Sequence, residues 1–250
     1  MLINFKDKII FVRPTKVASS TVQLYLFNIM KNDEVLDLGN ILISNDTLLI
    51  SDLLVEENSK KTKHQLNFYE DSFKRGYHYT YDEIKKKLSI DISNFTIVTA
   101  IRNPYDHALS RYLYEPVLYE NFKKLGLKQF LDIKKYIRGF IFSKIPLNEY
   151  FFHLYLKYAY QPYYLYFYSN GKDMSKIKIK LENLKEDLEE FAQNHNYINL
   201  GSKFKNLKIR KGVHYNYSQN VKKLYSERNR YLIEKMYGDF MKDNDYTFPG

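Results

Sequence analysis

The chain of 250 residues contains no cysteine and no tryptophan. Without cysteine it forms no disulfide, presents no thiolate nucleophile and binds no metal through sulfur. Its six histidines show neither an HExxH pattern nor the paired spacing of metal ligands. We therefore expect no metal site.

Long apolar segments are also missing. Met1 is followed by a charged, strand-like segment and not by the apolar core of a signal peptide. No stretch approaches the roughly 20 apolar residues that a membrane span needs. These absences predict a soluble, cytoplasmic protein without a membrane span.

The composition indicates a folded chain with an anionic partner. Hydrophobic residues make up 44% of the sequence, which is enough for a sizeable core in a single domain spanning residues 1–250. The net charge of +10 favours a nucleic acid, an acidic polysaccharide, an anionic lipid surface or a polyphosphorylated nucleotide. Lysine runs such as residues 85–87 are typical of solvated helix faces, so charge alone does not choose among these partners.

The sequence shows two strand–loop–helix patterns. Residues 9–12 and 95–101 are nearly continuous apolar segments, as expected of buried strands in a parallel sheet. A polar loop follows the first segment, and a helix through residue 30 is expected, with a serine N-cap at position 19 or 20. After the second segment, Asn103 suits an N-cap and Pro104 suits the first position of a helix.

Later segments add alternating strands and helices. Residues 81–88 predict a helix, and residues 176–181 alternate strictly, as in a half-buried strand. Asn183 and Glu186 have the spacing of a capping box at the start of another helix. Residues 233–241 place apolar side chains on one stripe of a last helix. The order of elements predicts an α/β fold with a central parallel sheet flanked by helices.

The loop after the first strand carries the residues of an anion site, from Lys16 to Thr21. N–H groups at a helix N-terminus and the helix dipole favour an anion, small residues allow its close approach, and hydroxyls and a lysine add donors and charge. The loop contains no glycine, so it is not a Walker A loop. An ordinary capped helix after a polar loop fits the same residues.

A second candidate site follows the second strand. Arg102 stands at the end of that strand, and Ser110 lies two turns into the next helix. In open α/β sheets, ligands bind beyond the carboxyl ends of the strands. An arginine fork with a hydroxyl suits a phosphate monoester, and a structural ion pair of Arg102 is the alternative.

Together the two segments resemble the sulfotransferases that use 3′-phosphoadenosine-5′-phosphosulfate (PAPS). Residues 11–21 (FVRPTKVASST) look like that family's 5′-phosphosulfate loop, and residues 97–112 (IVTAIRNPYDHALSRY) look like its 3′-phosphate motif. Weaker similarities cover residues 181–188 and, with the carbohydrate O-sulfotransferase branch, residues 214–246. Residues 210–212 resemble a loop that contacts the 3′-phosphate, with a solvated basic turn as the alternative.

The resemblance implies a P-loop-like sulfotransferase fold. It also implies transfer of a sulfuryl group from PAPS to a hydroxyl of a carbohydrate or related acceptor, with release of 3′-phosphoadenosine-5′-phosphate (PAP) and no need for a metal. Lys16 would stand beside the bridging oxygen of the leaving group. The residues implied for the 5′ side of the donor are Lys16, Val17, Ala18, Ser19, Ser20 and Thr21. Those implied for the 3′-phosphate are Arg102, Ser110, Arg210 and Lys211.

The acceptor hydroxyl also needs a general base, and a histidine suits this task near neutral pH. His78 stands where the hexuronic 2-O-sulfotransferase-like branch places a catalytic histidine, whereas other branches use a glutamate. His64, His107 and His153 are the fallback candidates, and His107 is expected on a helix surface. The aromatic segment of residues 136–168 is expected to fill a core, with an acceptor cleft as the alternative.

Two other functions stay open on the sequence alone. A P-loop-type small-molecule kinase would need Mg²⁺ and ATP, and the Walker lysine–serine pair is absent. A basic nucleic-acid-binding module would fit the charge and the aromatics, but no recognition motif is present, so we expect no nucleic-acid partner. The missing N-terminal anchor separates the chain from Golgi-resident relatives and predicts a bacterial or viral enzyme of the cytosol, where PAPS is made.

Overall fold

The computed structural model describes residues 1–30, 35–37, 78–88, 91–125, 140–141, 144, 148–197 and 223–249. The chain divides into two compact units. Unit 1 comprises Met1–Ile101 and Tyr163–Arg210, and unit 2 comprises Arg102–Pro162 and Lys211–Gly250. Within the described residues, no helix combines the length and the apolar character needed to cross a membrane.

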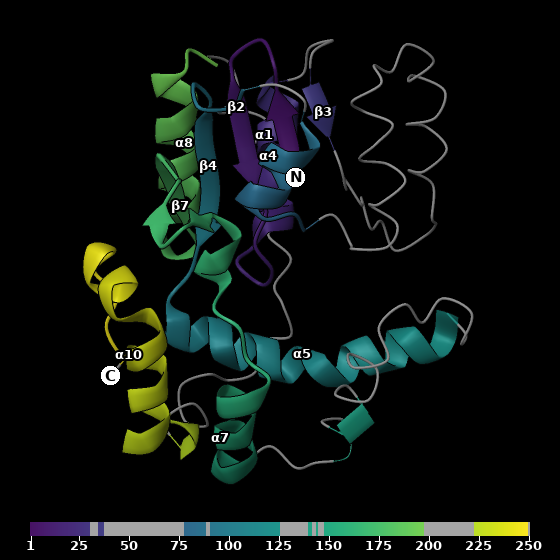
Figure 1. Ribbon diagram of the computed structural model, residues 1–250, viewed down its shortest axis with the longest axis vertical. Helices are drawn as coiled ribbons and strands as arrows, with labels where there is room; N and C mark the ends of the chain where they lie inside the picture. The colour runs from purple at the N-terminus through teal and green to yellow at the C-terminus, as the bar shows by residue number, and fades with distance from the viewer. Residues whose placement is uncertain are drawn as a thin grey trace. The chain divides into compact units, whose positions relative to one another are not determined.

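Unit 1 is built on a five-stranded sheet with the order β3-β1-β2-β4-β7 (Figure 1). The strands β2, β4 and β7 run parallel, and β1 is antiparallel to both of its neighbours. This arrangement confirms the expected α/β class with a central sheet. The sheet is mostly and not wholly parallel as expected, because β1 runs against its neighbours. The strands are β1 (Leu2–Asn4), β2 (Ile9–Val12), β3 (Val35–Asp37), β4 (Thr96–Ile101) and β7 (Ile177–Lys180).

The middle of the sheet matches the two apolar segments of the sequence. Every residue of β2 is buried, as expected of a strand covered on both faces. The register pairs Val12 with Thr99, so β4 continues past the point where β2 ends. The Thr99 hydroxyl donates to the Val12 carbonyl at 3.2 Å, which ties the end of β2 to its neighbour.

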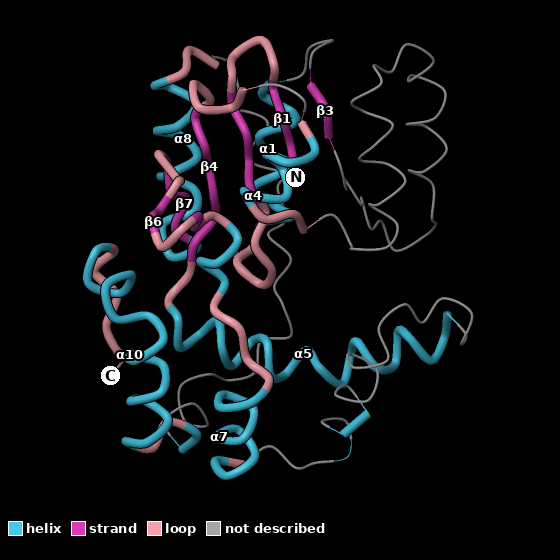
Figure 2. The backbone as a smooth tube through the Cα atoms, in the orientation of Figure 1, coloured by secondary structure: helices cyan, strands magenta, loops and turns pink. Residues whose placement is uncertain are grey.

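Helices flank the sheet of unit 1 (Figure 2). Helix α1 (Ser19–Met30) contacts β1, β3 and β4, and α8 (Leu184–Asn194) contacts β7. Helix α4 (Tyr81–Lys87) begins with a complete capping box between Thr80 and Glu83. The short elements of the unit are η2 (Tyr163–Tyr166), β5 (Tyr168–Ser169), β6 (Lys172–Asp173) and η3 (Leu181–Asn183).

The expected capping box at the start of α8 is wrong, although the helix itself is confirmed. Asn183 makes no side-chain capping bond. The 3-10 turn η3 occupies the residues immediately before the helix, and Asp187 instead accepts a hydrogen bond from the Lys180 backbone N–H at 2.6 Å. The spacing of residues in the sequence does not by itself predict such a turn.

Unit 2 consists of helices α5 (Pro104–Leu125), α7 (Glu149–Tyr158) and α10 (Glu227–Asp243). As expected, Asn103 caps α5, because its side-chain oxygen accepts from the Tyr105 N–H at 3.0 Å. Helix α5 contacts both α7 and α10. The described core includes Phe152, Tyr155 and Tyr160, whereas Tyr150 and Tyr158 of the same segment are exposed.

The expectation that His107 lies on a helix surface is wrong, because its side chain is 1% exposed. Its Nδ1 lies 2.7 Å from the Tyr160 hydroxyl, which lies 2.7 Å from the Tyr237 hydroxyl. Buried polar groups are tolerated when they are hydrogen-bonded. The two tyrosine hydroxyls, distant from His107 in sequence, form a hydrogen-bonded chain with the imidazole. This chain allows the ring to be buried in the core of unit 2.

A polar cluster joins the beginnings of α7 and α10. The Glu149 carboxylate accepts from Ser226 Oγ at 2.6 Å and from Arg228 Nε and Nη2 at 2.8 and 2.5 Å. The hydrogen bonds from Arg228, aided by the one from Ser226, lower the pKa of Glu149 from 4.5 to about 2. The cluster therefore stabilises the folded state only while Glu149 is ionised.

Removing this charge with Glu149→Gln is expected to lower the free energy of unfolding at pH 7 by about 1–2 kcal/mol, because the half-exposed Arg228 is partly screened by solvent. The folded pKa lies below the unfolded one, so the contribution is complete above pH 4.5 and is lost as the pH falls towards 2. Urea unfolding at pH 7 and near pH 2.5 measures the difference. Glu189→Gln, in an exposed pair with Lys185, is the control, with an expected loss below about 0.5 kcal/mol.

Candidate functional site

The β2–α1 loop, residues 13–18, starts at the carboxyl end of a central parallel strand of unit 1. Lys16 and Ala18 have φ angles of 61° and 56°, in the left-handed region, whereas Val17 between them does not. Each such residue with a Cβ costs about 1–2 kcal/mol. Anion-binding nests are formed where left-handed residues turn successive N–H groups towards one side, and two left-handed residues directly before a helix are compatible with that geometry. The loop thus holds strained backbone in a form that suits an anion.

The start of α1 adds further donors. The helix begins at Ser19, and the Ala18 carbonyl accepts from the Thr21 and Val22 N–H groups at 2.9 and 3.2 Å. Ala18 therefore takes the N-cap position, and the expected serine cap is wrong. The Ser19 hydroxyl instead donates to the Pro14 carbonyl at 2.6 Å and closes the loop. The first-turn N–H groups of an α-helix have no acceptor inside the helix and carry its positive dipole end.

Arg13 brings a guanidinium to this loop, a role that the sequence patterns did not predict. Its side chain is 7% exposed, and its Nη2 donates to Ser20 Oγ at 2.5 Å. The guanidinium therefore reaches from the end of β2 to the first turn of α1. The sequence did contain a signal for this role. An arginine that directly follows a fully apolar strand is expected to be buried, and a buried cation needs a specific partner.

His78 lies beside the same loop, although it is 65 residues from Arg13 in sequence. Its Nδ1 is 2.9 Å from the Arg13 carbonyl oxygen. A carbonyl only accepts, so Nδ1 carries the proton and the neutral ring has its lone pair on Nε2. The Tyr166 ring stands edge-on to the imidazole, with the ring centroids 6.3 Å apart. The structure thus brings one predicted base together with the predicted anion loop.

The second predicted motif begins unit 2. Arg102 follows Ile101, the last residue of β4, and is partly exposed. The next residue, Asn103, caps α5, and the partly exposed Ser110 lies in the second turn of that helix. The two predicted phosphate motifs therefore belong to different compact units.

Three other predicted site residues, Arg210, Lys211 and His64, lie outside the described residues. His153 and the buried His107 belong to hydrogen-bond networks of unit 2, and His153 Nδ1 lies 2.8 Å from the Asn229 side-chain oxygen.

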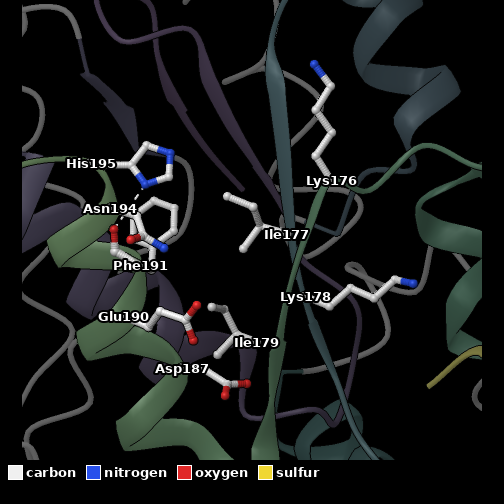
Figure 3. Close-up of a pocket in the computed structure, with 9 residues that line it drawn as sticks. All are labelled: Lys176, Ile177, Lys178, Ile179, Asp187, Glu190, Phe191, Asn194 and His195. Atoms are coloured by element: carbon white, nitrogen blue, oxygen red, sulfur yellow. Dashed lines mark hydrogen bonds between the residues drawn. The ribbon is translucent and has the colours of Figure 1, made fainter. Parts of the chain in front are cut away.

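A cavity of about 300 Å³ lies elsewhere in unit 1, between β7 and α8 (Figure 3). Ile177 and Ile179 point towards the helix, whereas the Lys176 and Lys178 side chains point away from it. Asp187 and Glu190 of α8 line the cavity. Burial raises the pKa of Asp187, and the charge of Glu190 adds to the effect. No described residue of the two predicted phosphate motifs is among those that line this cavity.

The β2–α1 loop, the Arg13 guanidinium and the His78 imidazole are the described groups of unit 1 that combine anion-binding geometry with a proton acceptor. They provide backbone donors, two cationic side chains counting Lys16, and a ring nitrogen with a lone pair. Such a set can bind a phosphorylated donor and accept a proton from a hydroxyl. Compared with known protein families, with curated proteins and with solved structures, the chain has no match.

Proposed function

We propose that the chain is a PAPS-dependent O-sulfotransferase with a P-loop-like sulfotransferase fold. It transfers a sulfuryl group from PAPS to a hydroxyl of a carbohydrate or related acceptor and releases PAP. The observation that carries the proposal is the β2–α1 loop, in which Lys16 and Ala18 adopt left-handed backbone next to Arg13 and His78.

The loop suits the 5′ side of PAPS because that side carries a phosphate and a sulfate joined by one bridging oxygen. The residues assigned to the 5′-phosphate are Val17, Ala18, Ser19, Ser20 and Thr21, through backbone N–H groups and hydroxyls. Strained non-glycine backbone is enriched at ligand-binding sites, and a loop that binds a close anion is such a site. Arg13 supplies a second positive charge at the loop through its bond to Ser20.

The reaction needs alignment and charge neutralisation more than covalent help. The acceptor oxygen attacks the sulfur atom while the bond from sulfur to the bridging oxygen breaks, and PAP leaves with the electron pair of that bond. Lys16 stabilises the negative charge that grows on the bridging oxygen. The proton of the acceptor hydroxyl passes to Nε2 of His78, which the bond from Nδ1 to the Arg13 carbonyl keeps in the required tautomer.

The 3′-phosphate is assigned to Arg102 and Ser110 on the sequence resemblance, and to Arg210 and Lys211 on the shorter match. Arg102 has the planar fork that binds phosphate through paired hydrogen bonds. Its place directly before the capped start of α5 gives it a defined backbone environment within unit 2. This assignment distinguishes PAPS from nucleotides that lack a 3′-phosphate.

Isothermal titration with PAP tests the proposal. We expect binding below about 10 µM, and a 10–100-fold weaker affinity in Arg102→Ala because a charge-assisted hydrogen bond contributes about 1.5–3 kcal/mol. Lys242→Ala, an exposed lysine of unit 2, is the matched control and should bind PAP as the wild type does.

Two results would contradict the proposal in different ways. No PAP binding at tens of micromolar would refute the sulfotransferase assignment, and binding of ATP with Mg²⁺ in its place would support the kinase alternative. Normal PAP affinity in Arg102→Ala would refute only the assignment of the 3′-phosphate. A gel shift of DNA or RNA with a steep salt dependence would instead favour a nucleic-acid partner.

A further inference from the structure

Residues 246–249, here called the C-terminal strap, follow the end of α10 in unit 2. The Tyr246 N–H donates to the Met241 carbonyl at 2.9 Å. The Tyr246 ring also stacks on Phe240, with the ring centroids 6.3 Å apart and the planes at 25°. These contacts anchor the beginning of the strap to the last turn of α10.

The strap is hydrogen-bonded to Asn103, the residue that caps α5. Asn103 donates from its side-chain Nδ2 to the Thr247 carbonyl at 2.9 Å. The oxygen of the same amide accepts from the Tyr105 N–H at 3.0 Å and caps the helix. One side chain therefore serves both the helix cap and the strap. Its orientation is set from both ends, because rotation of the amide would break both bonds.

Phe248 secures the strap in an aromatic cluster. Its ring centroid lies 5.0 Å from that of Tyr105 and 5.8 Å from that of Tyr225, both in edge-to-face geometry. The Arg230 guanidinium carbon lies 3.9 Å from the centre of the Phe248 ring. Such aromatic pairs and cation–π contacts are attractive beyond the apolar surface that they bury. The Tyr225 hydroxyl donates to the Tyr105 carbonyl at 2.5 Å and joins the cluster to the first turn of α5.

We propose that the C-terminal strap, through Phe248, is a positioning element for Arg102. The strap holds the Asn103 amide, and Asn103 is bonded directly to Arg102 along the chain. Both hydrogen bonds hold the Asn103 side chain and so restrict the conformations of the turn that carries Arg102 between β4 and α5. A guanidinium must be held within about 0.5 Å of its productive place to bind a phosphate through its fork.

The inference rests on the proposed function, because it requires that Arg102 bind the 3′-phosphate. It predicts a specific pattern of affinities. Loss of the strap contact should weaken binding that depends on the 3′-phosphate and leave the rest of the nucleotide unaffected, because a less ordered arginine must lose more freedom on binding.

The experiment compares titrations of PAP and of 5′-AMP, which lacks the 3′-phosphate, in the full chain. The quantity compared is the dissociation constant of 5′-AMP divided by that of PAP. In Phe248→Ala this ratio should fall about 5–20-fold, because PAP binds more weakly while the affinity for 5′-AMP is unchanged. Phe248→Tyr keeps the ring and should keep the wild-type ratio. Arg230→Met removes the cation–π contact but keeps an apolar stem, and should lower the ratio about 2–5-fold. It also tests the strap if Phe248→Ala does not fold.

The possible outcomes distinguish an error in the role of the strap from an error in the assignment of the 3′-phosphate site. If both variants keep the wild-type ratio, or lose PAP and 5′-AMP affinity equally, the strap has only a structural role and the inference is overturned while the proposed function stands. If the wild type shows no preference for PAP over 5′-AMP, or if Arg102→Ala keeps that preference, the assignment of the 3′-phosphate is wrong and the inference falls with it.

Discussion

Replacing Lys16 with alanine is expected to slow sulfuryl transfer about 10²–10³-fold, the range found when one group that stabilises a developing negative charge is removed. The effect should appear in kcat, because the charge on the bridging oxygen grows only as PAP leaves. Alanine, like lysine, carries a Cβ, so the left-handed conformation at this position has the same intrinsic cost in both. The loop backbone should therefore be retained, and the loss reports the ammonium group.

The measurement is PAP release from PAPS, followed by chromatography, with water and a panel of unsulfated polysaccharides as acceptors. Lys16→Arg keeps the positive charge and should retain more activity than Lys16→Ala. Lys6→Ala, an exposed lysine of unit 1, should have wild-type activity. Transfer by Lys16→Ala within about 3-fold of the wild-type rate would refute the role of the loop. Absence of PAP release by the wild type with every acceptor would refute the reaction itself.

Replacing His78 is expected to have an effect of similar size and a different signature. Loss of a general base lowers the transfer rate about 10²–10⁴-fold. PAP affinity should stay at the wild-type value, because the imidazole acts on the acceptor hydroxyl and not on the nucleotide. The informative variant is His78→Asn: its side-chain N–H can still donate to the Arg13 carbonyl, as Nδ1 of the imidazole does, but it offers no basic nitrogen.

The two His78 variants separate catalysis from support of the loop. If His78→Asn transfers at the wild-type rate, His78 is not the base. If His78→Ala is inactive and binds PAP poorly, whereas His78→Asn is normal in both respects, the histidine only supports the loop through Arg13. Wild-type PAP affinity with a large loss of transfer in both variants is the result that the proposal requires.

The local elements of the fold were predictable because their signals are local. The nearly continuous apolar segments that became β2 and β4 are almost entirely buried, as that pattern predicts. The start of α5 followed from Asn103 and Pro104, whose cap and fixed φ act over a few residues. At α8 the apolar periodicity was sufficient for the helix but not for its cap, because the preceding 3-10 turn satisfies the backbone in another way.

The candidate site was predictable in its residue types and not in its geometry. Lys16 and the small residues after it indicated an anion loop, because the sequence shows directly which residues can donate hydrogen bonds or supply positive charge. The left-handed backbone at Lys16 and Ala18 could not be predicted from the sequence, because neither residue favours it and the surrounding structure must impose it. The role of Arg13 was missed for the same reason: its bond to Ser20 exists only once the loop has folded.

The sequence by itself determined the α/β class, the two strand–loop–helix patterns and the residue types at both predicted phosphate motifs. Only the tertiary structure decided that His78 stands against Arg13, that His107 is buried against Tyr160, and that Phe248 closes on Tyr105. Each of these contacts joins residues more than fifty positions apart. Local propensity and periodicity carry no information about such pairs, because their formation depends on how whole helices and strands pack.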